Sequence, residues 1–270
     1  MKRTLWWGIV VALAAGIAAA FYYWQQGQEQ ALPPPAPQAA TPPAPPTPQP
    51  SPEPAIRHPL DTAAAPGEAG QPVPALDESD APLRQALAGL LGPKSLAALF
   101  YPDGIIRRIV ATVDNLPRKK LAPRLIPVKP APGKFAVSGA RDKAVIGPAN
   151  GARYAPYVRI AQAVDAPKLT AVYVRFYPLF QRAYEELGYP RGYFNDRLVE
   201  AIDDLLAAPA PQGPIKLVQP KVFYEYADPE LEQRSAGQKI MMRMGNENAA
   251  KLKDKLGEIR REVTRRGPRK

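Results

Sequence analysis

Residues 103–117 read DGIIRRIVATVDNLP, and this stretch decides the class of fold. Its apolar side chains recur at intervals of three and four residues, so in a helix they gather on one face. Asp103 is the predicted N-cap, and Pro117 ends the helix because it lacks a backbone N–H. The stretch therefore predicts an amphipathic helix that buries one face against other helices, through Ile105, Ile106, Ile109, Val110, Val113 and Leu116.

Helical spacing continues on both sides of this stretch. We expect further helices over residues 82–91, after Pro93, over 157–164 and 169–187, from Asn195 as an N-cap, over 229–244 and over 249–263. Residues 117–150 are rich in proline and predict an ordered, extended excursion with short strands near residues 134–138 and 144–146. Residues 216–226 alternate as in a hairpin. The predicted fold class is therefore mainly α: a single helical domain with a minor β element of short strands or a hairpin.

An uncharged run from Leu5 to Trp24 is long enough to span a bilayer as a helix. Aromatic residues lie at both of its ends, as they do at the two interfaces of a membrane. Lys2 and Arg3 precede the run, so the positive-inside rule places the N-terminus in the cytoplasm and the rest across the membrane. The alternative is a cleaved secretory signal with a small-residue site at residues 18–20, which delivers the domain to the same side. We expect an uncleaved anchor.

Proline dominates the segment that follows: 16 of the 35 prolines lie within residues 32–75, among almost no large apolar side chains. Such a segment cannot form a core and favours the extended polyproline-II conformation, which gives the domain reach. We therefore expect five parts. They are a cytoplasmic N-terminus (1–4), a transmembrane helix (5–24), a disordered Pro/Ala-rich linker (25–76), a folded helical domain (77–263) and a disordered basic tail (264–270).

The composition excludes several kinds of chemistry. The chain has no cysteine, which rules out disulfides, thiolate nucleophiles and cysteine-ligated metals. Its single histidine, His58, lies in the proline-rich segment, so the folded domain has no histidine for a catalytic triad or a metal site. We expect no metal, no cofactor and no catalytic residues.

Several strings within residues 76–261 are long and distinctive. They are residues 80–84 (DAPLR), 106–118 (IRRIVATVDNLPR), 128–130 (VKP), 148–150 (PAN), 152–158 (ARYAPYV), 177–181 (YPLFQ), 184–190 (YEELGYP), 192–198 (GYFNDRL), 217–221 (LVQPK) and 235–239 (SAGQK). On these strings the chain resembles a proteobacterial family catalogued as domain of unknown function 3014. The resemblance implies a Gram-negative envelope protein with an N-terminal anchor, and it implies no activity.

Nine of the twelve tyrosines fall between residues 154 and 226, several of them close to arginines. Both residue types are enriched in the energetic centres of interfaces, and flat aromatic rings suit sugars or peptides. The candidate binding residues are Arg153, Tyr154, Tyr157, Arg159, Arg175, Tyr177, Tyr193 and Asn195. The alternative is that tyrosines at helical spacing belong to the core. A second group, Arg107, Arg108 and Arg118, lies around Asp114 and Asn115 and forms either an anion site or a buried ion-pair network.

The domain is strongly basic, with a formal charge of about +12 against −1 for residues 1–76. Half of this excess lies in residues 251–270, which hold nine basic and three acidic residues. Across the membrane, the expected partners are an envelope protein, an acidic polymer or anionic lipid headgroups; nucleic acid becomes a candidate only if the topology is reversed. The alternative is a solvated helix face. The apolar stripe of this last helix either packs on its own domain or supports self-association.

Adjacent acids such as Glu185-Glu186 and Asp203-Asp204 point away from each other on a helix, so they do not form the facing pair of a glycosidase. We therefore expect a non-enzymatic binding or scaffold module, anchored in the bacterial inner membrane by a single span with its domain in the periplasm. The alternatives are a carboxylate- or tyrosine-based hydrolase of envelope glycan and an energy-coupling or scaffold subunit of an envelope machine. The sequence identifies no ligand.

Overall fold

A computed structural model describes residues 55–60, 73–140 and 143–265 of the chain. This part is mainly helical, with two small antiparallel hairpins, as the sequence predicts. None of its helices combines the length and apolar character that a bilayer crossing needs. The expected membrane span over residues 5–24, most of the linker and the end of the basic tail lie outside the described residues.

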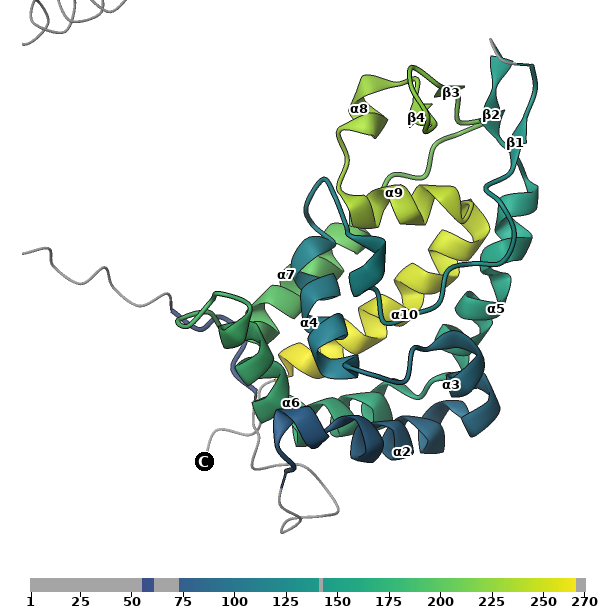
Figure 1. Cartoon of the computed structure of the whole chain (residues 1–270). Helices are drawn as coiled ribbons and strands as arrows, with labels where there is room; N and C mark the ends of the chain where they lie inside the picture. Colours follow the sequence, from purple (N-terminus) through teal and green to yellow (C-terminus); the bar gives the residue numbers. More distant parts are fainter. Residues whose placement is uncertain (1–54, 61–72, 141–142, 266–270) are drawn as a thin grey trace, which may run out of the picture. The chain divides into compact units, whose positions relative to one another are not determined.

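Helix α4 (Ile105–Asn115) is the centre of the main core, as its apolar face predicts. It packs on α6 (Ala166–Glu186) and α7 (Phe194–Leu206), while α2 (Asp80–Leu91) lies across α6 (Figure 1). A short helix, η2 (Leu76–Glu78), precedes α2, and α3 (Pro93–Leu99) follows it after the turn at Gly92. Burial of these apolar faces is the main stabilising contribution, because few of the core side chains retain contact with water.

The predicted cap of α4 is wrong, because the capping group comes from another helix. The N-cap residue is Gly104, whose φ of 64° is a left-handed conformation that favours glycine. The Asp80 carboxylate at the start of α2 accepts hydrogen bonds from the amides of Gly104 (2.7 Å) and Ile105 (2.9 Å). Asp80 therefore satisfies two unpaired N–H groups of α4 and ties the two helices together.

The last helix, α10 (Asn246–Thr264), runs along α5 (Ala149–Ala163), α6 and α7 (Figure 1). Its apolar stripe is used inside the domain: Leu252 packs near Val158, and Leu256 and Val263 pack with residues of α7. The apolar stripe of this helix therefore packs on its own domain, as the first of the two alternatives predicts.

The start of α7 corrects two expectations. Tyr193, and not Asn195, is the N-cap, and Asn195 is fully buried within the first turn. Residues 55–60, expected to be part of a disordered linker, bind here instead. The Asp196 carboxylate accepts from the amides of Arg57 (2.9 Å) and His58 (2.7 Å), and Leu60 packs against the main core. This part of the linker therefore belongs to the domain.

Two hairpins lie together at one end of the domain (Figure 1). The first pairs β1 (Val137–Ser138) with β2 (Val145–Ile146), and the second pairs β3 (Leu217–Val218) with β4 (Glu225–Tyr226). A single bridge between Val145 and Lys216 joins them. Both hairpins lie where the sequence predicts strands. The long excursion between α4 and α5 also holds a short helix, η3 (Pro123–Leu125).

The prediction of one helix over residues 229–244 is wrong, because this stretch forms two helices. Helix α8 (Pro229–Glu232) ends, and Ser235 caps a new helix, α9 (Ala236–Arg243), by accepting from the amide of Gln238 (3.0 Å). The first amides of α9, at Ala236 and Gly237, donate to the carbonyls of Arg118 (2.7 Å) and Leu116 (2.9 Å) at the end of α4. Two helix ends thus satisfy each other's unpaired backbone groups.

Gly237 makes this helix-end contact possible. A Cβ atom there would lie 2.7 Å from the Leu205 Cδ2 atom and 3.2 Å from the Leu116 carbonyl oxygen. An added Cβ would displace the end of the Leu205 side chain and press on the Leu116 carbonyl, so glycine serves close packing here rather than an unusual φ.

Candidate binding site

Helix α5 carries three of the predicted binding residues to one place. Arg153 donates to the carbonyl oxygens of Ala131 (3.2 Å), Pro132 (2.8 Å) and Gly133 (3.0 Å), and the Tyr157 hydroxyl lies 3.1 Å from the carbonyls of Lys129 and Pro130. Carbonyls in a proline-rich segment have few N–H partners nearby, and these side chains replace them. Arg153 and Tyr157 therefore hold the segment in place.

The fixed segment forms one wall of a large hollow, which we call the basic pocket. Its volume is about 940 Å³, and α5, α9 and residues 119–133 line it, together with Phe223 from the second hairpin. Six of its lining residues are cationic and none is acidic. The cations are Lys119, Lys120, Lys129, Arg153, Lys239 and Arg243.

Four of the six cations already bind groups of the protein. Lys129 donates to the Ala97 carbonyl (2.8 Å), Lys239 pairs with Glu232, and the guanidinium of Arg243 lies 5.9 Å from the centre of the Tyr226 ring. Arg153 holds residues 131–133. Within the described part of the chain, Lys119 and Lys120 are exposed and have no ion-pair or hydrogen-bond partner for their ammonium groups. These two lysines are thus the charges that a ligand can reach.

The rest of the basic pocket is apolar. Aliphatic side chains of residues 121, 126, 128, 240 and 244 lie beside Tyr154, while Phe223 is 80% exposed at its edge. Val222, next to Phe223, is 77% exposed. Large apolar side chains left this open usually mark an interaction surface when they adjoin one another.

The other predicted binding residues do not join the basic pocket. Tyr177 and Asn195 are buried in the core at α6 and α7, so neither is available to a surface ligand. The Tyr193 hydroxyl accepts from the amide of Leu60 (2.9 Å), which makes it part of the docking of residues 55–60. The guanidinium of Arg175 lies 5.3 Å from the ring centre of Phe176. For Tyr177 and Tyr193 the alternative given for the tyrosines, a place in the core and at its edge, is the one observed.

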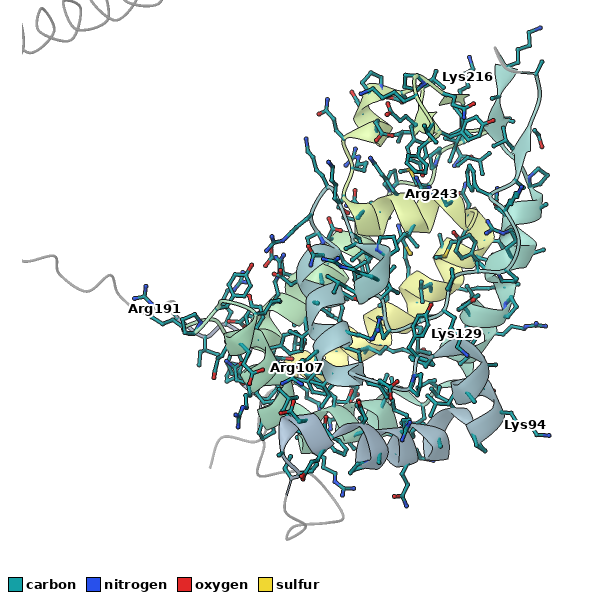
Figure 2. The ribbon with its side chains drawn as sticks, in the orientation of Figure 1. Lys94, Arg107, Lys129, Arg191, Lys216 and Arg243 are labelled. Carbon is teal, nitrogen blue, oxygen red and sulfur yellow. The ribbon has the colours of Figure 1, made fainter. Side chains whose placement is uncertain are left out.

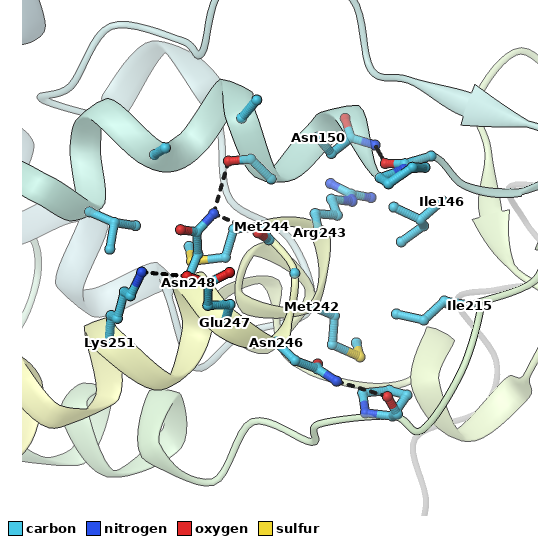
Figure 3. A pocket seen from close by; sticks show the side chains of 18 of the residues that line it. Ile146, Asn150, Ile215, Met242, Arg243, Met244, Asn246, Glu247, Asn248 and Lys251 are labelled. Atoms are coloured by element: carbon cyan, nitrogen blue, oxygen red, sulfur yellow. Dashed lines mark hydrogen bonds and ion pairs between the residues drawn. The ribbon is translucent and has the colours of Figure 1, made fainter.

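Arg159 lies on another face of α5, beside a second hollow of about 640 Å³ between α5 and the α9–α10 junction. Figure 3 shows how the polar groups of this hollow are engaged. The Asn248 amide donates to the carbonyls of Gly151 and Met244 (both 2.9 Å), and Asn246 donates to Pro211 (2.9 Å). Because these amides bind backbone carbonyls, we assign them to the joining of loops and helices.

The three arginines of the predicted anion site are separated. Arg107, beside α6 (Figure 2), pairs with Asp77 (2.7 Å) and Glu186 (3.1 Å), and Arg108 donates to the Arg124 carbonyl (2.6 Å). Arg118 pairs with Asp114 (2.8 Å). Arg118 fits the ion-pair alternative, although its own side chain is 48% exposed. The buried member is Asp114, which also binds Arg197, a partner that the sequence does not reveal. The guanidinium groups do not converge on a common point.

The chemistry of a hydrolase finds little support among the described residues. Asp203 pairs with Arg260, while Asp204 accepts from Ser235 and Gln238, so the two carboxylates serve separate contacts. Burial raises the pKa of Tyr177 far above its ordinary value and raises the pKa of Tyr226 to about 12. A nucleophilic tyrosine needs the opposite shift, since the phenolate is the reactive form. No group of three or more acidic or histidine side chains in this part could hold a metal ion.

Many cations of α10 also bind their own domain. Lys255 is buried and donates to the Val164 carbonyl (2.9 Å), Lys253 donates to Ala208, and Arg260 forms a two-point pair with Asp203. The basic character of this helix is therefore partly structural. The free cations of the basic pocket are the better candidates for a partner.

Together, the fold and the pocket define a helical domain with a cationic hollow that has an exposed aromatic side chain at its edge. The chain belongs to the family described as "Protein of unknown function (DUF3014)", whose model matches residues 105–260, more than half of the chain. The match confirms the resemblance over these residues, while residues 80–84 lie outside it. No curated protein and no solved structure matches the chain.

Sequence reasoning missed the two lysines that matter most in the basic pocket. Lys119 and Lys120 follow Pro117 and Arg118 and look like ordinary surface charge. The sequence does offer one signal for these lysines. The pair stands between the end of a helix and a proline-rich segment, and no acidic residue lies close to it in the sequence. Phe223 was also missed, since alternation in a hairpin predicts which residues share a face and not which face stays uncovered.

Proposed function

We propose that this protein is a non-enzymatic binding module whose basic pocket holds an acidic segment of another polypeptide. The observation that carries the proposal is the lining of the pocket: six cations, no acid, and two lysines without partners. Lys119 and Lys120, which have no counterion among the described residues, raise the local potential and attract an anionic partner. A carboxylate-bearing ligand relieves the repulsion between Lys119 and Lys120.

The apolar lining favours a polypeptide over the other anionic partners. Lipid headgroups lie in a plane, whereas this site is a hollow of about 940 Å³. An anionic glycan offers carboxylates but no aliphatic side chains for the apolar lining and the exposed Phe223. An acidic peptide with interspersed apolar residues offers both, and burial of its apolar side chains supplies affinity that charge alone does not.

We further propose that the module works in the periplasm, held to the inner membrane by the span over residues 5–24. The support is the uncharged run with cations before it. The proline-rich residues between the span and residue 55 would let the basic pocket meet partners away from the anchoring bilayer. The partner is then an envelope protein.

Charge reversal of the two free lysines tests this proposal. The full chain, in nanodiscs of zwitterionic lipid, is titrated into a fluorescein-labelled peptide that alternates Glu with Leu and Phe, and anisotropy is followed. Lys119→Glu with Lys120→Glu is expected to weaken binding at least about tenfold, because repulsion replaces attraction at the pocket mouth. Added salt is expected to weaken wild-type binding by screening.

The matched control is Lys94→Glu with Lys168→Glu, which changes the net charge equally on exposed helices that do not line the basic pocket. Lys94 lies on α3 (Figure 2). The control double variant should bind the peptide with an affinity within about twofold of the wild type. If both double variants weaken binding equally, the domain attracts anions only through its net charge and the proposal fails. Equal binding of a peptide with Gln in place of Glu would also contradict it.

A further inference from the structure

Residues 55–60, which we call the strap, lie against the start of α7 and form neither a helix nor a strand. Among the described residues, four hydrogen bonds hold the strap, and each joins a backbone group of the strap to a side chain of the domain. The Asp196 carboxylate accepts two of them and the Tyr193 hydroxyl accepts the third. The Asn195 amide donates the fourth to the His58 carbonyl (2.8 Å). The strap is therefore attached through its backbone at one short site.

Little of the strap is buried. Leu60 packs against the main core and is partly buried, whereas Ile56 is 54% exposed and Arg57 is exposed. A segment with few buried apolar contacts and with hydrogen bonds near the surface opens at a lower free energy than the core does. Water can also replace the partners of backbone groups that lie at the surface. These features predict that the strap leaves α7 more readily than the domain unfolds.

The domain keeps its own contacts when the strap leaves. Asn195 also donates to the Val263 carbonyl (3.0 Å) and accepts from the Tyr173 hydroxyl (3.2 Å), so it stays tied to α10 and α6. The chain has a second attachment at Leu76, which is 6% exposed in the main core. Release of the strap thus moves the point where the chain joins the domain toward Leu76.

The two attachments give the preceding chain two lengths. The chain between the uncharged run and the domain comprises residues 25–54 when the strap is bound, and residues 25–72 when it is released. Release adds residues 55–72, which is on the order of 60 Å of extended chain. Because the two states differ in length, a pull on the domain favours the longer one.

We propose that the strap sets the length of the tether between the membrane and the basic pocket. The proposal rests on the anchor proposed above, since tether length matters only for a domain that is held at a membrane. With the strap bound, the tether is short and the basic pocket works near the bilayer. A partner that is bound in the pocket and fixed farther away pulls the strap from α7, and the tether lengthens without unfolding of the domain.

Optical tweezers test the proposal on single molecules of the full chain. The chain has no cysteine, so Gln28→Cys and Lys94→Cys supply the two attachment points for the handles. We expect a reversible step at low force, with the length of residues 55–72, before the domain unfolds. Asp196→Ala should lower the force of this early step, because it removes two of the four hydrogen bonds. The force of domain unfolding should stay the same.

Glu200→Ala is the matched control, because Glu200 lies one turn further along α7 and pairs with Arg197 (2.8 Å) instead of the strap. This variant should leave the early step unchanged. If the wild type shows no early step, or if Asp196→Ala leaves its force unchanged, the strap is a fixed part of the domain and the proposal is overturned.

The anchor is tested separately, by co-purification of the full chain with nanodiscs. We expect the chain to co-purify, which together with the early step supports the tether. An early step in a chain that does not co-purify overturns the tether because the anchor fails. Co-purification without an early step overturns the strap and leaves the anchor and the basic pocket as proposed.

Discussion

Replacement of Asp114 by alanine is expected to lower the free energy of unfolding by about 3 kcal/mol, the lower end of the cost of breaking a buried ion pair. The Asp114 side chain is 6% exposed and pairs with Arg118 (2.8 Å) and Arg197 (3.1 Å). Arg197 is itself only 15% exposed, and loss of the carboxylate leaves its guanidinium with Glu200 (2.8 Å) as the remaining ion-pair partner. Urea unfolding followed by circular dichroism measures the effect.

A surface ion pair provides the comparison. Glu186 pairs with Arg107 and Arg182, and all three side chains are more than 40% exposed. Glu186→Ala should therefore cost less than about 1 kcal/mol. If Asp114→Ala and Glu186→Ala lower the free energy of unfolding equally, the Asp114 network stabilises the domain no more than a surface ion pair does.

Replacement of Asn195 by alanine is expected to destabilise the domain by about 2–4 kcal/mol. The buried Asn195 amide donates to the carbonyls of His58 (2.8 Å) and Val263 (3.0 Å) and accepts from the Tyr173 hydroxyl (3.2 Å). Alanine leaves these three groups unsatisfied away from water, each at a cost of about 1–3 kcal/mol before relaxation. Chemical denaturation gives the total loss, and hydrogen exchange shows where the structure loosens.

Asp196→Ala separates two effects expected of Asn195→Ala, the loosening of residues 55–60 and the loosening of the end of α10. Among the described residues, Asp196 holds only the amides of Arg57 and His58, so its loss should raise hydrogen exchange in residues 55–60 and leave the end of α10 protected. Asn195→Ala should raise exchange in both places. If α10 stays protected in Asn195→Ala, the amide does not hold the helix end.

The helices were predictable because their apolar spacing is local information. The errors lie where a contact between distant segments decides the structure. Asp80, 25 residues away in sequence, caps α4 in place of Asp103. The end of α4 binds the start of α9, which divides a stretch that has continuous helical spacing. Neither partner can be identified from a single sequence, since capping rules describe only near neighbours.

The candidate site was predictable only in part. Arg153, Tyr154 and Tyr157 do line the basic pocket, as their aromatic and basic character indicates. Arg153 and Tyr157, however, donate hydrogen bonds to the carbonyls of the proline-rich segment. Spacing also could not show that Tyr177 and Asn195 are buried. Whether a tyrosine faces a ligand or a core depends on which helix covers it, and that is a tertiary property.

The central claim is that the basic pocket binds an acidic segment of another protein, and photocrosslinking from its edge tests this most directly. A photoreactive residue in place of the exposed Phe223 is introduced into the full chain in cells, and crosslinked peptides are sequenced by mass spectrometry. The prediction is that crosslinks fall on segments rich in Asp and Glu with interspersed apolar residues, and that Lys119→Glu with Lys120→Glu removes them while Lys94→Glu with Lys168→Glu does not. Crosslinks to lipid or glycan alone, or to protein segments without excess acid, would contradict the claim.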